Sequence, residues 1–187
     1  LRINSPNDIV VRSDGALYFT DSPGALYNVG MAAEDLQQYL DFQGVFRISA
    51  DGSRLDAVVT DTVYPNGLAF TPDESVLYVN DTRLGEIRAY DVLADGSCGP
   101  QRLFHKLTGS EPGIADGMKV DGEGNVYCTG PGGIHVIAPD GKLLGRIRIP
   151  DHCTNLAWGG EDWRSLFITT YSSVYRTRVN LPGAAVW

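Results

Sequence analysis

Short apolar runs separated by clusters of glycine, proline, aspartate and asparagine recur along the whole chain. This punctuation between Val-, Ile- and Tyr-rich runs is typical of antiparallel strands joined by tight turns. Four segments share one pattern: a polar pair, an apolar run, a charged or Gly-rich tip, and an apolar or aromatic run. They are SPNDIVVRSDGALYFTDS (5–22), YPNGLAFTPDESVLYVND (64–81), IADGMKVDGEGNVYCTGP (114–131) and CTNLAWGGEDWRSLFITTY (153–171). Each of the four predicts a strand hairpin.

Further strand pairs are predicted between these hairpins. They turn at the Asp-Gly dipeptides 51–52, 95–96 and 140–141, and one last strand lies within 173–183. The first polar residues of the four segments follow one another at steps of 59, 50 and 38 residues; they are Asn7, Asn66, Asp116 and Thr154. Steps of roughly 40–50 residues with about four strands each are typical of β-propeller blades. The pattern therefore predicts an all-β propeller with about four blades in this chain.

One stretch departs from the β pattern. Within NVGMAAEDLQQYLDF the apolar residues recur near helical spacing, which predicts a short helical insertion near 28–42. Such an insertion either covers the mouth of the channel as a lid or is a decorative loop. The rest of the pattern is continuous and predicts a single domain over 1–187. Because an open ring of blades leaves strand edges unpaired, either this is an unusually small propeller or part of the ring is missing. We expect the second, an N-terminally incomplete domain.

The composition limits the kinds of partner. The formal net charge is −8, and no Lys/Arg cluster stands out, which disfavours nucleic acid and anionic membranes. No apolar run approaches the ~20 residues needed to span a bilayer. Cys98, Cys128 and Cys153 are odd in number and widely spaced, so we expect three reduced thiols, no zinc site and a cytoplasmic location. The oligomeric state is left open.

The aligned polar residues are the candidate site. In a propeller the innermost strands line a central channel, so Asn7, Asn66, Asp116 and Thr154 are expected to approach one another. Converging amide and carboxylate oxygens suit Ca²⁺, Mg²⁺ or Mn²⁺, and one more carboxylate would be expected to complete such a set. The alternative is that Asn-Gly and Asp-Gly serve here only as good turn formers.

Other polar residues carry weaker signals. Asp8 either supports the site or is a turn aspartate. Asp21, Asn80 and Asp81 end the second strand of two hairpins, and we expect them at the opposite rim of the propeller. The three histidines show no metal-ligand spacing, and the absence of a GxSxG motif disfavours a serine hydrolase.

Three motifs carry a family resemblance: SPND at 5–8, PNGLAFTPD at 65–73 with LYVND after it, and ADGMKVDGEGNVYCTGPGGIHVIAPDGKLLGRI at 115–147. In this order they resemble the SMP-30/gluconolactonase/luciferin-regenerating-enzyme-like family over essentially the whole chain. Members of that family are six-bladed β-propellers that use one divalent metal in the channel to hydrolyse sugar lactones and, in some members, phosphotriesters. The chain resembles the C-terminal two-thirds of such a protein.

The resemblance implies roles for three residues. Asn66 of PNGLAF and Asp116 of DGMKVD match metal ligands, and Asp116 also matches the proton acceptor and donor. Asn7 of SPND matches the asparagine that faces both metal and substrate. The family's remaining ligand is a Glu in an EGP-type motif, and Glu111-Pro112 is out of place for it. This fourth ligand is therefore expected to be missing from the chain.

The resemblance and the chemistry together imply a metal-dependent hydrolase that opens sugar lactones. One divalent ion would activate a water, with Asp116 as proton acceptor and donor. Ca²⁺ is the first expectation, and Zn²⁺, Mg²⁺ and Mn²⁺ are alternatives. The expected partner is a small-molecule lactone. Two other functions stay open: phosphotriester hydrolysis at the same site, and a non-catalytic propeller that acts as a binding module or is an inactive fragment.

Overall fold

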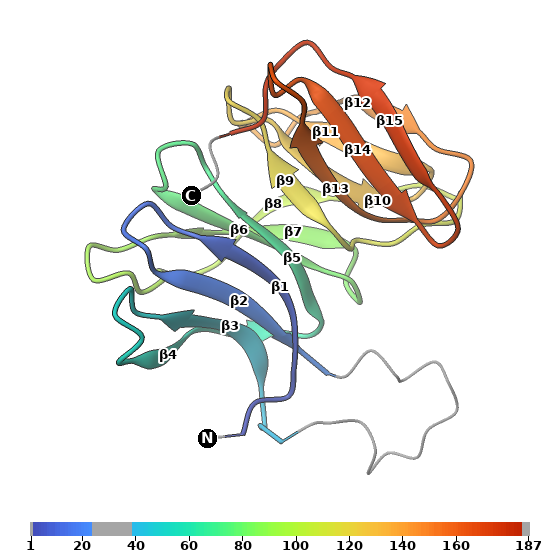
Figure 1. Cartoon of the computed structure of the whole chain (residues 1–187). Coiled ribbons are helices and arrows are strands. Elements are labelled where there is room, and N and C mark those ends of the chain that lie inside the picture. The colour runs from blue at the N-terminus through green and yellow to red at the C-terminus, as the bar shows by residue number, and fades with distance from the viewer. Residues whose placement is uncertain (1, 24–38, 185–187) are drawn as a thin grey trace.

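The computed structural model describes residues 2–23 and 39–184, and strands joined by turns make up these two ranges (Figure 1). Neither range contains a helix, so the predicted all-β class is confirmed. The helical insertion predicted near 28–42 lies largely outside the described residues. Its described end, residues 39–42, is irregular backbone.

The described strands form four antiparallel sheets, in each of which neighbours along the chain pair with one another. The first sheet consists of β1 (Ser5–Val11), β2 (Leu17–Ser22), β3 (Gln43–Ile48) and β4 (Leu55–Thr62). The second consists of β5 (Pro65–Phe70), β6 (Val76–Asp81), β7 (Glu86–Asp91) and β8 (Arg102–Lys106). The third consists of β9 (Met118–Val120), β10 (Val126–Gly130), β11 (Gly133–Ile137) and β12 (Leu143–Arg148). The fourth consists of β13 (Cys153–Gly159), β14 (Ser165–Thr170) and β15 (Val174–Arg178).

The four sheets follow one another as blades of a propeller (Figure 1). Their first strands, β1, β5, β9 and β13, lie side by side in that order. The predicted blade count is therefore confirmed within the described residues. All three predicted Asp-Gly turns join the third and fourth strands of a blade. Gly96 and Gly141, for example, adopt φ of +82° and +84°, a region that glycine enters without a Cβ clash.

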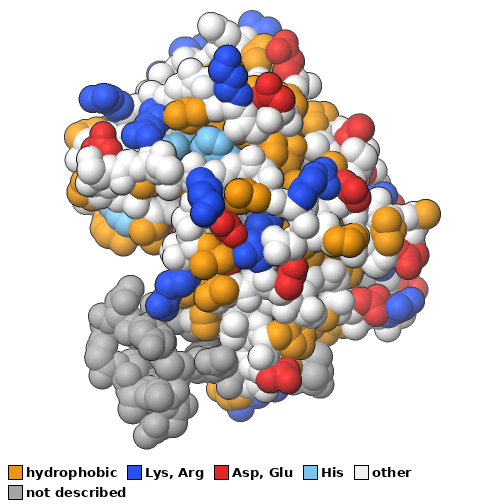
Figure 2. Space-filling view, turned by 180° about the vertical axis from the view of Figure 1, so that it is seen from behind, with side chains coloured by type: hydrophobic (Ala, Val, Ile, Leu, Met, Phe, Trp, Pro, Cys, Tyr) orange, Lys and Arg blue, Asp and Glu red, His pale blue; other side chains and the backbone are white. Residues whose placement is uncertain are grey.

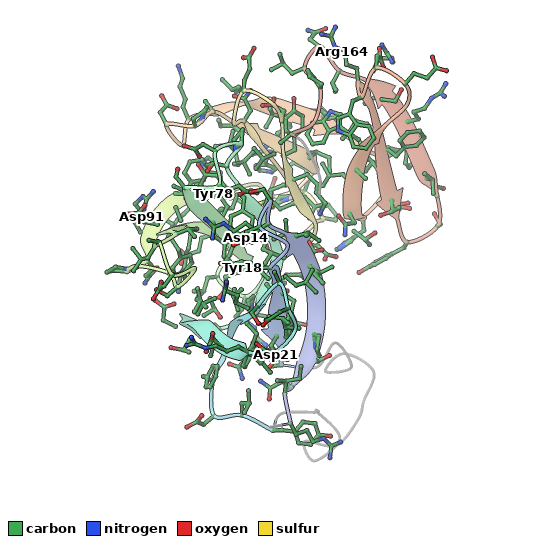
Figure 3. The ribbon with its side chains drawn as sticks, turned by 60° about the vertical axis from the view of Figure 1, so that its left-hand side comes forward. Asp14, Tyr18, Asp21, Tyr78, Asp91 and Arg164 are labelled. Atoms are coloured by element: carbon green, nitrogen blue, oxygen red, sulfur yellow. The ribbon has the colours of Figure 1, made fainter. Side chains whose placement is uncertain are left out.

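The core lies between the blades and follows from the alternation of side chains along each strand. On β6, Leu77 and Val79 pack toward the first blade, whereas Tyr78 between them packs toward the third. Tyr18 and Tyr78 mark two successive interfaces of this kind (Figure 3). An aromatic contact lies at each interface. Tyr18 meets Phe70 of the second blade edge-on, with 5.0 Å between ring centroids, and Tyr78 meets Phe104 of its own blade at 4.5 Å. A blade that has a neighbour on each side buries both of its faces. Its strands therefore appear in the sequence as continuous apolar runs.

The prediction that Asp21, Asn80 and Asp81 lie at the opposite rim is wrong. In an antiparallel pair the end of one strand lies beside the start of its partner. Asp21 pairs with Pro6 and Asp81 with Pro65, so these residues share the rim of Asn7 and Asn66. Figure 3 shows Asp14 at the hairpin tip of the first blade and Asp21 toward its other end.

The inner strands approach closely at two glycines. The backbone N–H of Gly67 donates to the carbonyl of Asp116 at 3.0 Å, and that of Gly117 donates to the carbonyl of Thr154 at 2.9 Å. A Cβ on Gly67 would lie 2.3 Å from the Asp116 carbonyl oxygen. A Cβ on Gly117 would lie 2.3 Å from the Asn155 side-chain oxygen. Only glycine therefore permits these links between successive blades.

Gly67→Ala is expected to destabilise the protein by about 1–3 kcal/mol, since the added methyl must push two inner strands apart. The free energy of unfolding measured by denaturant titration checks this. Gly145→Ala is the matched control, because Gly145 lies on a strand but an added Cβ meets nothing within 4 Å. Equal stability of the two variants would contradict the close-approach argument.

Candidate active site

The strand registers place the four candidate residues at equivalent positions. Asn7, Asn66 and Thr154 each lie at an irregularity of the ladder between the first and second strands of a blade. Asp116 precedes Met118, the first residue of β9, by the same interval by which Asn66 precedes Leu68. A β-bulge aims a side chain away from its regular direction, which suits a site at the rim.

Asn66 is buried, with 6% of its surface exposed. Its side-chain Nδ2 donates to the Thr82 hydroxyl at 3.1 Å, and this hydroxyl donates to the carbonyl of Ala115 at 2.6 Å. Thr82 follows β6, so the second blade supplies both Asn66 and the group that holds it. The same hydroxyl reaches the residue immediately before Asp116.

Asp116 is held through its backbone. Its N–H donates to the Thr129 hydroxyl at 2.8 Å. Its carbonyl accepts hydrogen bonds from the Gly67 N–H at 3.0 Å and from the Asn80 Nδ2 at 2.6 Å. These contacts occupy the main-chain polar groups, while the carboxylate is hydrogen-bonded by the Asn66 amide.

Burial raises the pKa of the Asp116 carboxyl to about 6. The Asn66 amide opposes this shift by hydrogen bonding, and the nearby Asp8 carboxylate adds to it. Asp116 forms no ion pair with a Lys or Arg of the described chain. A partly buried carboxylate without a cation is a candidate functional group, because a bound cation would offset its desolvation.

The structure brings the Asp116 side chain together with those of Asn66 and Asp8. The Asp8 carboxylate forms an ion pair with the Lys119 ammonium group at 3.5 Å. It also lies near enough to Asp116 to raise the pKa of the Asp116 carboxyl. Asn7 is exposed, and its side chain has no hydrogen bond within the described residues. The Thr154 hydroxyl bonds to that of Thr169 at 2.9 Å, so it is already partnered.

The donors fit a hard divalent cation. They are amide and carboxylate oxygens, which suit Ca²⁺, Mg²⁺ or Mn²⁺. No group of three His, Cys, Asp or Glu side chains assembles in the part of the chain that the structure describes. A metal would thus depend on the amide oxygens of Asn66 and Asn7 together with the Asp116 carboxylate.

A cavity of about 360 Å³ opens between the inner strands. Its walls are mostly apolar and include Leu68, Val120 and Trp158 from three blades. Lys119 lines this cavity and also pairs with Asp8, so the cavity and the candidate site are neighbours. The chain therefore combines a polar rim with an apolar hollow beside it.

Sequence reasoning missed the residues that hold the site. Thr82 and Asn80 bond to backbone carbonyls of the next blade, at sequence distances of 33 and 36 residues. Thr129 bonds to the Asp116 N–H within its own blade, 13 residues away. One signal was available: a polar residue lies one or two positions before the end of the second strand of each hairpin, as Thr20, Asn80, Thr129 and Thr169 do.

Comparison with known proteins assigns this chain to a family. Residues 1–172 match the family described as SMP-30/Gluconolactonase/LRE-like region. The chain belongs to this family. The resemblance predicted from the SPND, PNGLAF and DGMKVD motifs is thereby confirmed.

Two curated relatives of this chain are named as lactonases. The gluconolactonase of Zymomonas mobilis is 37% identical over 190 residues, which cover 97% of this chain and 52% of that protein. The 6-deoxy-6-sulfogluconolactonase of Pseudomonas putida is 31% identical over 75% of this chain and 54% of that protein. The chain thus spans about half the length of these curated relatives.

Solved structures agree on the fold. A gluconolactonase from Xanthomonas campestris superposes with a TM-score of 0.79 at 34% identity, covering 97% of this chain and 58% of that one. A regucalcin from Agrobacterium tumefaciens, described as a calcium-binding protein, superposes with a TM-score of 0.73 at 20% identity. It covers 96% of this chain and 62% of that one, and at this identity the likeness concerns the fold alone.

Asp116→Asn is expected to stabilise the metal-free protein at pH 7.5 by about 1–3 kcal/mol, because the folded state holds an ionised carboxylate at a desolvation cost. The raised pKa means that the folded state binds this proton more tightly than the unfolded chain. The unfolding free energy of the metal-free wild type should therefore rise as pH falls from about 6 toward 4, and Asp116→Asn should remove this part of the pH dependence. Denaturant titrations at several pH values check both points. A less stable Asp116→Asn variant would contradict the raised pKa.

Proposed function

We propose that the protein carrying this chain is a metal-dependent hydrolase that opens sugar lactones. The observation that carries the proposal is the pairing of Asp116, a partly buried carboxylate without a protein cation, with the Asn66 amide at the rim of the inner strands. Two named lactonases at 37% and 31% identity support the same reaction class.

The proposed cofactor is one divalent ion, with Ca²⁺ first among the candidates. Asn66, Asp116 and Asn7 would hold it through oxygen atoms, together with one further carboxylate. When bound, the ion polarises the lactone carbonyl and lowers the pKa of a water.

Asp116 is the proposed proton acceptor and donor. Its carboxylate takes a proton from the attacking water while the water oxygen bonds to the lactone carbonyl carbon. The C–O bond to the ring oxygen then breaks, and Asp116 returns the proton to that oxygen, which becomes a hydroxyl. Because Thr129, Gly67 and Asn80 fix the Asp116 backbone, the carboxylate stays in place during both transfers.

Asn7 is the proposed substrate contact. Its exposed side chain carries both an amide donor and an acceptor, which can orient a carbonyl or a sugar hydroxyl.

The molecular surface is consistent with a small-molecule substrate. Figure 2 shows positive and negative side chains interspersed on the face it draws, and the net charge is −8. No helix among the described residues has the length and apolar character needed to cross a membrane.

The intact protein should hydrolyse an aldonolactone such as glucono-lactone only with a divalent ion. Chelation should remove the activity, and Ca²⁺ should restore it. Acid release followed by titration at constant pH measures the reaction. If the protein hydrolysed a phosphotriester with a metal but no lactone, the site would be that of a phosphotriesterase. If it hydrolysed neither, the proposal of a hydrolase would be refuted.

Two substitutions test the residues. Asp116→Asn should lower kcat/KM by about 10³-fold or more, because both a metal ligand and the proton acceptor are lost. Asn66→Ala should weaken metal binding and activity by at least about 10–100-fold. Asp73→Asn is the matched control for the first change, since Asp73 lies in the turn at the far end of the same blade as Asn66. Retained activity in Asp116→Asn would refute its assignment.

A further inference from the structure

Thr82 connects the two central residues of the candidate site. Its backbone N–H donates to the carbonyl of Tyr64 at 2.9 Å, which fixes it beside the start of β5. Its hydroxyl lies 2.6 Å from the Ala115 carbonyl oxygen and 3.1 Å from the Asn66 Nδ2. One side chain thus contacts the amide of Asn66 and the residue that precedes Asp116 on the next blade.

The direction of these bonds follows from their partners. A carbonyl can only accept, so the single hydroxyl proton of Thr82 points to Ala115. Toward Asn66 the Thr82 oxygen must therefore accept, and the NH₂ end of the amide must face it. The Asp116 carboxylate, which also hydrogen-bonds the Asn66 side chain, likewise accepts from the NH₂ end. The Asn66 Oδ1 is then turned away from both partners. Among the described residues no hydrogen bond uses this oxygen, so it is available to a ligand.

The orientation of the amide decides whether Asn66 can bind a cation. The two ends of an asparagine amide have nearly the same shape and exchange places on a 180° rotation. The oxygen end ligates a divalent ion, whereas the NH₂ end repels it. The partial charge that meets the ion therefore depends on what the other end of the amide contacts.

We propose that Thr82 is a positioning residue that fixes the Asn66 amide with Oδ1 facing the metal. The inference rests on the proposed metal-dependent function. By holding the Ala115 carbonyl with the same hydroxyl, Thr82 also sets the spacing between Asn66 and Asp116. Asn80 and Gly67 hold the next carbonyl, that of Asp116, so Thr82 is the part of this network that reaches a side chain of the site.

Three variants of the intact protein test the proposal. Thr82→Val keeps the shape and removes the hydroxyl, and Thr82→Ser restores the hydroxyl. Thr62→Val is the matched control: the Thr62 hydroxyl also donates to a backbone carbonyl, that of Gln43 at 2.8 Å, and this bond lies within the first blade. Unfolding midpoints of the variants separate a general loss of stability from a local effect.

The first measurement needs no metal. In the metal-free wild type, the Asn66 side-chain NH₂ signals in a ¹⁵N-resolved NMR spectrum, assigned by their loss in Asn66→Ala, should show slow solvent exchange. This protection should persist in Thr82→Ser and Thr62→Val and decrease in Thr82→Val, where the Asp116 carboxylate remains as the other partner of the NH₂ group. Unprotected signals in the wild type, or unchanged protection in Thr82→Val, would overturn the Thr82–Asn66 hydrogen bond.

The second measurement is calcium binding by isothermal titration. Thr82→Val should weaken Ca²⁺ affinity by roughly 10–100-fold, with Thr82→Ser and Thr62→Val close to the wild type. Wild-type affinity in Thr82→Val would overturn the positioning role while leaving the metal site standing. A wild type that binds no divalent ion would overturn the proposed metal site, and with it the metal-facing role of Thr82.

Discussion

The close approach of the inner strands is the constraint on which the rest of this structure depends. Gly67 and Gly117 let the start of one blade hydrogen-bond to the backbone of the next, at Asp116 and Thr154. A side chain at either glycine would occupy the space of its neighbour. The links tie residues from different blades into one rim, and the apolar interfaces between the blades, such as that of Tyr18 and Phe70, hold these strands in contact.

A carboxylate placed at this rim is costly to stability and useful to chemistry for the same reason. Burial raises the pKa of Asp116 to about 6, and no Lys or Arg within the described residues forms an ion pair with it. The surrounding bonds from Thr129 and Asn80 satisfy its backbone instead of its side chain. The ionised Asp116 carboxylate therefore carries a desolvation cost that no protein cation offsets and that a bound cation would reduce. Such an uncompensated cost is common among functional carboxylates.

Much of the fold was predictable from local pattern. The apolar runs between Asp-Gly and Asn-Gly turns identified the hairpins, and the repeated polar position aligned Asn7, Asn66 and Thr154 as the strand registers do. The rim assignment of Asp21 and Asp81 failed because the strand pairing, and not the distance along the chain, places a strand end. Thr82 escaped notice because a lone threonine after a strand carries no local signal of the partners it will meet.

The sequence by itself determined the all-β class, the blade repeat and the residues that could supply oxygen ligands, since strand alternation and turn formation are local properties of neighbouring residues. Only the tertiary structure decided which of these residues meet. It brought Asp116 close to Asn66 and Asp8, left Asn7 exposed, and placed the Thr82 hydroxyl between the Asn66 amide and the Ala115 carbonyl. The physical reason is that a hydrogen bond between blades, and the desolvation that shifts a pKa, arise from contacts between distant segments.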